Sequence, residues 1–354
     1  MICALRSMDT VQISSYCIFN QLFNIYKPMS KENLSKIAVL GMGGTIAGVA
    51  SDPQNPKKYI AGALGVADLI GRLGLSNPLQ TDVRNVAQIN SKDMQVPHWQ
   101  ALLSDMQTAN QDPQTRAVVI THGTDTLEET ACLLEVMGPW SKPVVLTCAM
   151  LPANAPDADG PDNLKNALDW ASYSTACEVF VVCAGKVHLS QDVQKLTTED
   201  VDAFTSGPQG CFASKQGGQW EIHRQIPDRM TLKQPSMAFA LAQAKWPRVE
   251  MVTNHALNDG AVVRALLATS ASEDTPLSGI VLAGTGMGTA SQGLELALKK
   301  AQDLGVRVWL SSRCAFGLAH AQADTVWGVV TPLSAAKART ALCLELLAEQ
   351  ENQC

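Results

Sequence analysis

Small polar side chains gather at two places where an apolar run of the chain ends. Residues 43–48 (Gly-Gly-Thr-Ile-Ala-Gly) follow one run, and their glycines let backbone amides approach a ligand and leave Thr45 at the tip of the expected strand. Residues 121–130 pack hydroxyls and carboxylates behind a second run. Helix capping accounts for one or two of these side chains, but not for the whole cluster. The remainder is available for chemistry, and a threonine hydroxyl becomes a nucleophile when a base or polarising group adjoins it.

These turns need elements that bring them to one edge of a sheet. From residue 36 onward, runs rich in Val and Ile alternate with segments whose apolar residues recur at helical spacing. In the first half, we predict strands at residues 37–40, 116–120, 143–147 and 179–183 and helices over residues 99–106 and 127–137. This alternation is typical of a doubly wound α/β domain with a parallel sheet. Ligands bind such sheets beyond the carboxyl ends of the strands, which is where both polar turns lie.

The pattern changes after residue 210. Residues 216–219 (Gln-Gly-Gly-Gln) predict a hairpin, and the polar residues 227–235 have no clear periodicity. A second α/β series follows, with strands predicted at 249–253, 280–283 and 306–310 and helices at 261–268, 294–302 and 335–348. We therefore predict a poorly ordered N-terminal extension (1–35), a larger N-terminal domain (36–225), a linker (226–245) and a smaller C-terminal α/β domain (246–354).

Composition excludes several classes of protein. The 354 residues are 46% hydrophobic and 17% charged, which provides a large core and excludes a disordered chain. A net charge of −6 argues against nucleic-acid binding, and no uncharged apolar stretch approaches the ~20 residues that span a membrane. The ten cysteines lack the spacing of a metal site, and several lie in apolar runs, so we expect reduced thiols and a cytoplasmic location.

Residues 1–29 do not resemble a secretory signal. Polar residues such as Asp9 and Gln12 interrupt the apolar stretch of ~7–15 residues that a signal requires. The sequence leaves open whether residues 1–28 belong to the native protein or whether translation starts at Met29.

A nucleotide-binding interpretation of the first turn is weak. Gly41 and Gly43 fit the pattern Gly-x-Gly-x-x-Gly, but Ile46 stands at the third glycine position. Residues 60–65 contain no Asp or Glu to hold a ribose, and no Gly-Lys-Ser/Thr follows to form a phosphate loop.

Residues 43–48 and 121–130 together resemble the two signatures of the bacterial-type L-asparaginase family. The resemblance implies amide hydrolysis by acyl transfer at Thr45, activated by Tyr59 from a mobile flap. It also implies a second hydroxyl centre at Thr124, assisted by Asp125 and Lys195. It leaves open which threonine carries the covalent intermediate.

The same resemblance assigns the groups that bind substrate. Asp125, together with Thr124, would hold the substrate, with the carboxylate of Asp125 on its ammonium group. Ser91 resembles the serine that binds the α-carboxylate, and the amide of Ala149 would support the carbonyl oxygen or leaving group. Lys92 stands where the family often has Gln, and its cation could strengthen carboxylate binding.

Two further departures concern specificity. Leu257 stands where glutamine-tolerant relatives often have Asn, with Asn258 one step away, which makes efficient glutaminase activity less expected. The family often supplies a Glu to the substrate ammonium from a neighbouring subunit. No Glu occurs between Lys300 and Glu345, and the nearest candidates are Gln322 and Asp324.

The sequence thus predicts an L-asparaginase that needs no metal or organic cofactor and binds neither nucleic acid nor membrane. The resemblance implies a homodimer or homotetramer with active sites at subunit interfaces. Two alternatives stay open: a broader glutaminase-asparaginase or related small-amide hydrolase, and a non-catalytic sensor that binds amino acids.

Overall fold

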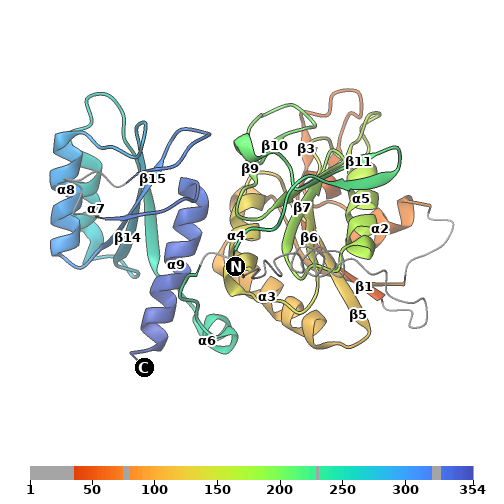
Figure 1. Ribbon diagram of the computed structural model, residues 1–354, viewed down its shortest axis with the longest axis horizontal. Coiled ribbons are helices and arrows are strands. Elements are labelled where there is room, and N and C mark those ends of the chain that lie inside the picture. Colours follow the sequence, from red (N-terminus) through yellow and green to blue (C-terminus); the bar gives the residue numbers. More distant parts are fainter. Residues whose placement is uncertain (1–35, 75–79, 229–230, 321–327, 354) are drawn as a thin grey trace, which may run out of the picture.

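The computed structural model describes residues 36–74, 80–228, 231–320 and 328–353. Two α/β domains lie side by side in Figure 1, the larger coloured from red to green and the smaller from teal to blue. Each domain is built on a sheet that is wholly or mainly parallel, so the predicted fold class is confirmed. The predicted N-terminal extension lies outside the described residues, and the predicted domain boundaries stay predictions.

Among the described residues, the larger domain has an eight-stranded sheet with the order β12-β11-β8-β7-β6-β5-β1-β4. The parallel part consists of β4 (Thr81–Ile89), β1 (Lys36–Gly43), β5 (Thr115–Thr121), β6 (Val144–Thr147) and β7 (Val179–Cys183). Beyond β7 the sheet continues in antiparallel strands, namely β8 (Lys186–Leu189), β11 (Ala213–Gln216) and β12 (Gln219–Ile222). The predicted hairpin is the connection between β11 and β12, so that prediction is confirmed.

Helices cover both faces of this sheet. One face carries α3 (Val96–Gln111) and α4 (Leu127–Met137), and the other carries α2 (Val66–Arg72) and α5 (Gly160–Tyr173). Alternate residues of β1 pack on opposite faces, with Ala38 and Leu40 toward the first pair of helices and Ile37 and Val39 toward the second. All four are fully buried, which explains why they form a continuous apolar run in the sequence.

The described part of the smaller domain contains a parallel four-stranded sheet. Its strands are β13 (Arg248–Thr253), β14 (Leu277–Gly284), β15 (Arg307–Ser312) and β16 (Val329–Val330). One face packs against α7 (Ala261–Ser270) and α8 (Gln292–Asp303), and the other against α9 (Ala335–Glu351). Because α9 also packs against α4, it joins the cores of the two domains (Figure 1). Helix α6 (Met237–Ala242) lies within the predicted linker and contacts α3.

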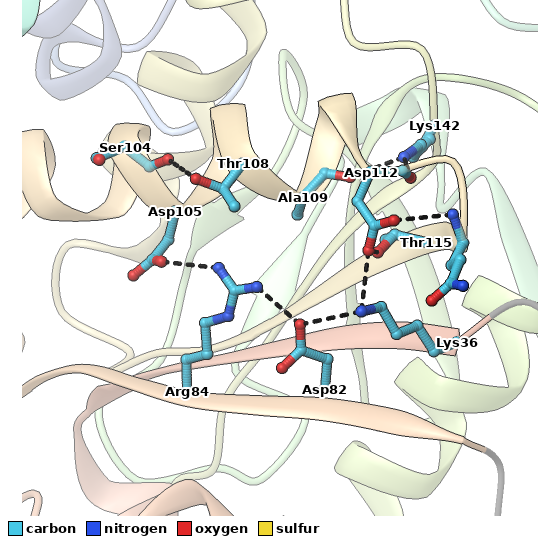
Figure 2. A network of polar contacts seen from close by, with 11 residues as sticks. Lys36, Asp82, Arg84, Ser104, Asp105, Thr108, Ala109, Asp112, Thr115 and Lys142 are labelled. Carbon is cyan, nitrogen blue, oxygen red and sulfur yellow. Dashed lines mark hydrogen bonds and ion pairs between the residues drawn. The ribbon is translucent and has the colours of Figure 1, made fainter.

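Charged side chains tie the elements together at the amino ends of the parallel strands (Figure 2). The ammonium of Lys36, at the start of β1, lies 2.9 Å from the carboxylate of Asp112 and 3.5 Å from that of Asp82. Arg84 links Asp82 at 2.7 Å to Asp105 of α3 at 3.1 Å. The hydrogen bond from Lys36 contributes most to lowering the pKa of Asp112 to about 2. This network braces the amino ends of the strands, whereas the polar turns lie at their carboxyl ends.

Candidate active site

Three turns at the carboxyl ends of neighbouring strands touch one another. The turn after β1 contains Gly44, whose φ is +80°, and a Cβ added there would lie 2.3 Å from the Cα of Gly123 in the turn after β5. A Cβ added at Gly123 would lie 2.6 Å from the Oγ of Ser91, which follows β4. Only glycine allows contacts this close. Thr45 directly follows Gly44, and Thr124 directly follows Gly123. The two threonines therefore lie on touching turns at the carboxyl ends of β1 and β5.

The first hydroxyl group is paired with a tyrosine. Thr45 lies in a short 3₁₀ turn (Thr45–Ala47), is 7% exposed, and its Oγ1 is 2.7 Å from the hydroxyl of Tyr59. Tyr59 belongs to β3 (Tyr59–Ile60), which forms a small antiparallel hairpin with β2 (Val49–Ala50). Its ring packs on Gly48, where an added Cβ would lie 2.7 Å from a ring carbon. The predicted flap thus places Tyr59 directly on Thr45.

The second hydroxyl group is paired with a lysine. The ammonium of Lys195 donates to Thr124 Oγ1 at 2.9 Å and to Asp125 Oδ1 at 2.8 Å. Lys195 lies in β9 (Gln194–Lys195), which pairs with β10 (Phe204–Thr205), so a short hairpin carries it over the end of the sheet. Thr124 is buried, whereas the Asp125 side chain is 50% exposed. The exposed part of the Asp125 carboxylate can therefore accept a hydrogen bond from an incoming cation.

Of the two residues predicted to bind the α-carboxylate of the substrate, Ser91 is buried and Lys92 is exposed. Ser91 is 2% exposed, and its Oγ accepts a hydrogen bond of 3.2 Å from the backbone N–H of Asp125. The backbone oxygen of Ser91 accepts from the Thr126 hydroxyl at 2.9 Å, which locks this turn to the turn after β5. The ammonium of Lys92 is exposed and forms an ion pair of 3.1 Å with Asp93.

The turn carrying Ala149 is braced by two polar residues that the sequence analysis did not identify. Ala149 is buried just beyond β6. Asp159 accepts hydrogen bonds from the backbone N–H groups of Met150 (3.0 Å) and Leu151 (2.9 Å). Asn163 of α5 donates to the carbonyl of Cys148, directly before Ala149, at 3.0 Å. Burial raises the pKa of Asp159 above its ordinary value. These contacts fix the direction of the backbone at Ala149.

A buried histidine supports the turn after β5. His122 is fully buried, and its Nδ1 lies 2.8 Å from the carbonyl oxygen of Gly123, while its Nε2 lies 3.0 Å from the hydroxyl of Thr130. The indole N–H of Trp99 donates to the same hydroxyl at 3.0 Å. Burial lowers the pKa of His122 to about 4. The ring is therefore neutral near pH 7 and serves as a structural link.

Two of the three predicted departures from the family pattern concern the smaller domain. Leu257 has a φ of +64° and a fully exposed side chain, a conformation that Asn tolerates better than Leu. The neighbouring Asn258 is buried, and its side chain bonds to the carbonyl of Thr253 and the N–H of Gly260. Gln322 and Asp324, the candidate ammonium ligands, lie outside the described residues.

The described residues contain neither of two features that would point to other functions, a metal-binding group and a membrane-spanning helix. No group of three or more His, Cys, Asp and Glu side chains is arranged to hold a metal ion within the described residues. No helix in the same part of the chain combines the length and apolar character needed to cross a lipid bilayer.

Two family models match nearly the whole described chain. The model for "Asparaginase, N-terminal" covers residues 36–228, and the model for "Glutaminase/Asparaginase C-terminal domain" covers residues 248–353. The chain belongs to the asparaginase family. The resemblance inferred from residues 43–48 and 121–130 is thereby confirmed.

Individual asparaginases match along most of their length. L-asparaginase 2 of Escherichia coli (strain K12) is 33% identical over 332 residues, which cover 90% of this chain and 91% of that protein. A glutaminase-asparaginase of Pseudomonas fluorescens biotype A is 30% identical, with 92% of this chain and 90% of that protein covered. Among solved structures, a probable cytoplasmic L-asparaginase from Campylobacter jejuni matches with a TM-score of 0.76 and 29% identity, covering 90% of this chain and 98% of that chain.

Proposed function

We propose that this protein is an L-asparaginase, which hydrolyses L-asparagine to L-aspartate and ammonia without a metal or organic cofactor. The observation that carries the proposal is the contact between the turns of Gly44 and Gly123. This contact brings the Thr45–Tyr59 pair and the Thr124–Lys195 pair to one edge of the sheet. Two hydroxyls, each with its own polar partner, suit acyl transfer from an amide to an oxygen and then to water.

In the proposed reaction, Thr45 Oγ1 attacks the carbon of the side-chain amide, and its proton is passed on within the hydroxyl network. The C–N bond then breaks, the nitrogen takes up a proton and leaves as ammonia, and an ester joins Thr45 to the aspartyl group. A water molecule attacks this ester, releases aspartate and restores the Thr45 hydroxyl. Tyr59 orients Thr45, while Thr124 and Lys195 transfer protons, and the amide of Ala149 stabilises the oxyanion. The alternative with Thr124 as the nucleophile stays open.

The proposed binding mode uses the exposed side of Asp125 for the substrate ammonium and Ser91 for its α-carboxylate, with Lys92 reaching the carboxylate only by leaving Asp93. Leu257 in place of Asn favours asparagine over glutamine. The second candidate is a broader glutaminase-asparaginase, as the Pseudomonas relative is named.

Assembly and location belong to the proposal as well. We infer a homodimer or homotetramer whose active sites lie at subunit interfaces, and a cytoplasmic location like the one that the name of the Campylobacter protein gives for that relative. The thiols of Cys132, Cys148, Cys183 and Cys343 are buried and form no disulfide, which suits a reducing compartment.

The test is ammonia release by the wild type and by Thr45→Ala and Thr124→Ala variants, with circular dichroism to establish that each variant is folded. Each substitution is expected to lower kcat by at least about 1000-fold, the scale seen when a nucleophile or its activating partner is removed. A wild type that binds asparagine but releases no ammonia would indicate the sensor instead. Similar kcat/KM values for asparagine and glutamine would indicate the broader hydrolase.

A further inference from the structure

A lysine of the smaller domain is buried against the segment that carries Lys195. Lys337, in the first turn of α9, is 2% exposed. Its ammonium donates to the backbone carbonyls of Gln191 at 2.5 Å and Ser190 at 3.4 Å. Removing an ammonium group from water is costly unless hydrogen bonds and an opposite charge replace the lost solvent. The position of Lys337 therefore requires partners on the larger domain.

The opposite charge comes from α4. Glu128 is the main carboxylate acting on Lys337, with Asp192 contributing less. Among the residues that the structure describes, the Oε2 atom of Glu128 is buried without a hydrogen-bond partner. Burial raises the pKa of Glu128 to about 7 and lowers the pKa of Lys337, and the charge of each group opposes the shift of the other. The thiol of Cys132, one turn further along α4, donates to the carbonyl of Lys337 at 3.4 Å.

Both members of this pair hold the same short segment, residues 190–195. Lys337 binds the carbonyls at its beginning, and the carboxylate of Glu128 faces the backbone N–H of Lys195 at its end. Between these two points, Asp192 is paired with Arg224. The segment is thus attached at its beginning, middle and end before it presents the Lys195 side chain to Thr124.

We propose that Lys337 and Glu128 are positioning residues for Lys195, so that the smaller domain fixes the lysine that acts on Thr124. The inference rests on the proposed function, because it presumes that Lys195 takes part in catalysis. Its physical basis is geometric. The 2.9 Å contact from Lys195 to Thr124 would be lost if the segment moved by about 1 Å, and a misplacement of that size can cost about 100-fold in rate.

The experiment uses the full chain and compares Lys337→Met with a matched control, Arg339→Met. Arg339 also connects α9 to α4, through Glu129 at 3.9 Å, but its hydrogen bond goes to the carbonyl of Val249 at 3.0 Å and not to the segment of residues 190–195. We expect Lys337→Met to lower kcat by about 10- to 100-fold with KM changed less than about threefold, and Arg339→Met to stay within about twofold of the wild type. Equal kcat values for the two variants would overturn the proposal.

A second measurement separates positioning from general damage to the fold. In a Lys195→Ala background, Lys337→Met should cause no further loss of kcat, because its effect passes through Lys195. An additional loss of the same size as in the wild type would refute the positioning role. If Lys337→Met does not fold, the neutral pair Lys337→Met with Glu128→Gln removes both charges and should fold, with the same fall in kcat. A Lys195→Ala variant with wild-type activity would instead refute the proposed role of Lys195 itself, so the two failures are distinguishable.

Discussion

Acid should weaken the turn after β5 through His122, because the hydrogen bonds of its ring specify the neutral form. The carbonyl of Gly123 can only accept, so Nδ1 carries the proton. Trp99 can only donate to the hydroxyl of Thr130, which in turn donates to the bare Nε2 of the histidine. Protonation of Nε2 would place two donors against each other in a site without water access. It would disturb the residue that precedes Gly123 and Thr124.

The size of the effect follows from the pKa of His122, which burial lowers from 6.5 to about 4. A lowered pKa means that the unfolded chain binds the proton more readily than the folded one. The neutral ring therefore contributes stability that is present above pH 6.5 and is lost as the pH falls through 4. Linkage gives a loss of about 2 kcal/mol at pH 5 and about 3 kcal/mol at pH 4, relative to neutral pH. Glu128, with its pKa raised to about 7, has the opposite sign, since its contribution is greatest in acid and is lost as the pH rises through 7.

The assay compares the wild type with His122→Gln by urea unfolding, followed by tryptophan fluorescence, between about pH 7.5 and about pH 4. Every other titrating group, including Glu128, is common to both proteins, so the difference in unfolding free energy isolates the histidine. We expect His122→Gln to have a lower unfolding free energy than the wild type at neutral pH. The difference between the two proteins should narrow by about 3 kcal/mol at pH 4. The exposed His255→Gln serves as the control and should run parallel to the wild type. A constant gap between the wild type and His122→Gln would refute the assignment of a neutral, buried ring.

Two further predictions concern the touching turns and the ion-pair network at the amino ends of the strands. Gly44→Ala adds a Cβ to a residue with φ +80° and places it 2.3 Å from the backbone of the neighbouring turn. The substitution should lower the free energy of unfolding, measured by thermal unfolding, by more than about 3 kcal/mol and abolish ammonia release. Gly218→Ala, at φ +83° with nothing within 4 Å, should cost only about 1 kcal/mol, and equal losses would show that the contact is unimportant. Asp82→Asn should cost about 1 kcal/mol by weakening the ion pairs with Lys36 and Arg84, and the loss should shrink in about 1 M salt. A loss that is independent of salt would contradict the electrostatic explanation.

The strands that could be predicted are those whose surroundings leave a trace in the local sequence. Residues 37–40 read as a strand because both faces of β1 are covered, and Gly217 with Gly218 signals the β11–β12 hairpin directly. Strand β4 could not be predicted, because it lies at the sheet edge with its side chains partly exposed, and its apolar residues show neither a continuous run nor a regular alternation with polar ones. The pairs β2–β3 and β9–β10 contain only two residues per strand, too few to show any period.

The polar turns could also be located from the sequence, because the two hydroxyl clusters exceed what helix capping requires. Their partners could not be derived in the same way. Tyr59 and Lys195 lie 14 and 71 residues from the threonines that they contact, and only the family resemblance connected them. Asp159 and Asn163 could not be identified from the sequence, because polar residues at the start of a helix are ordinarily caps. Their contact with residues 148–151 depends on how α5 packs beside β6.

Lys337 shows where sequence reasoning stops for a physical reason. A lysine in a helix is ordinarily a solvated side chain, and nothing within residues 335–351 distinguishes this one. Its burial arises only when α9 packs against α4, which is about 200 residues earlier in the chain. Its charge is then compensated by the carbonyls of Ser190 and Gln191 and by the nearby carboxylate of Glu128. The pair therefore cannot form before the two domains have docked. If it positions Lys195 as proposed, the larger domain would carry all five predicted catalytic side chains and still lack full activity alone, because the segment that orients the lysine would have lost its anchor.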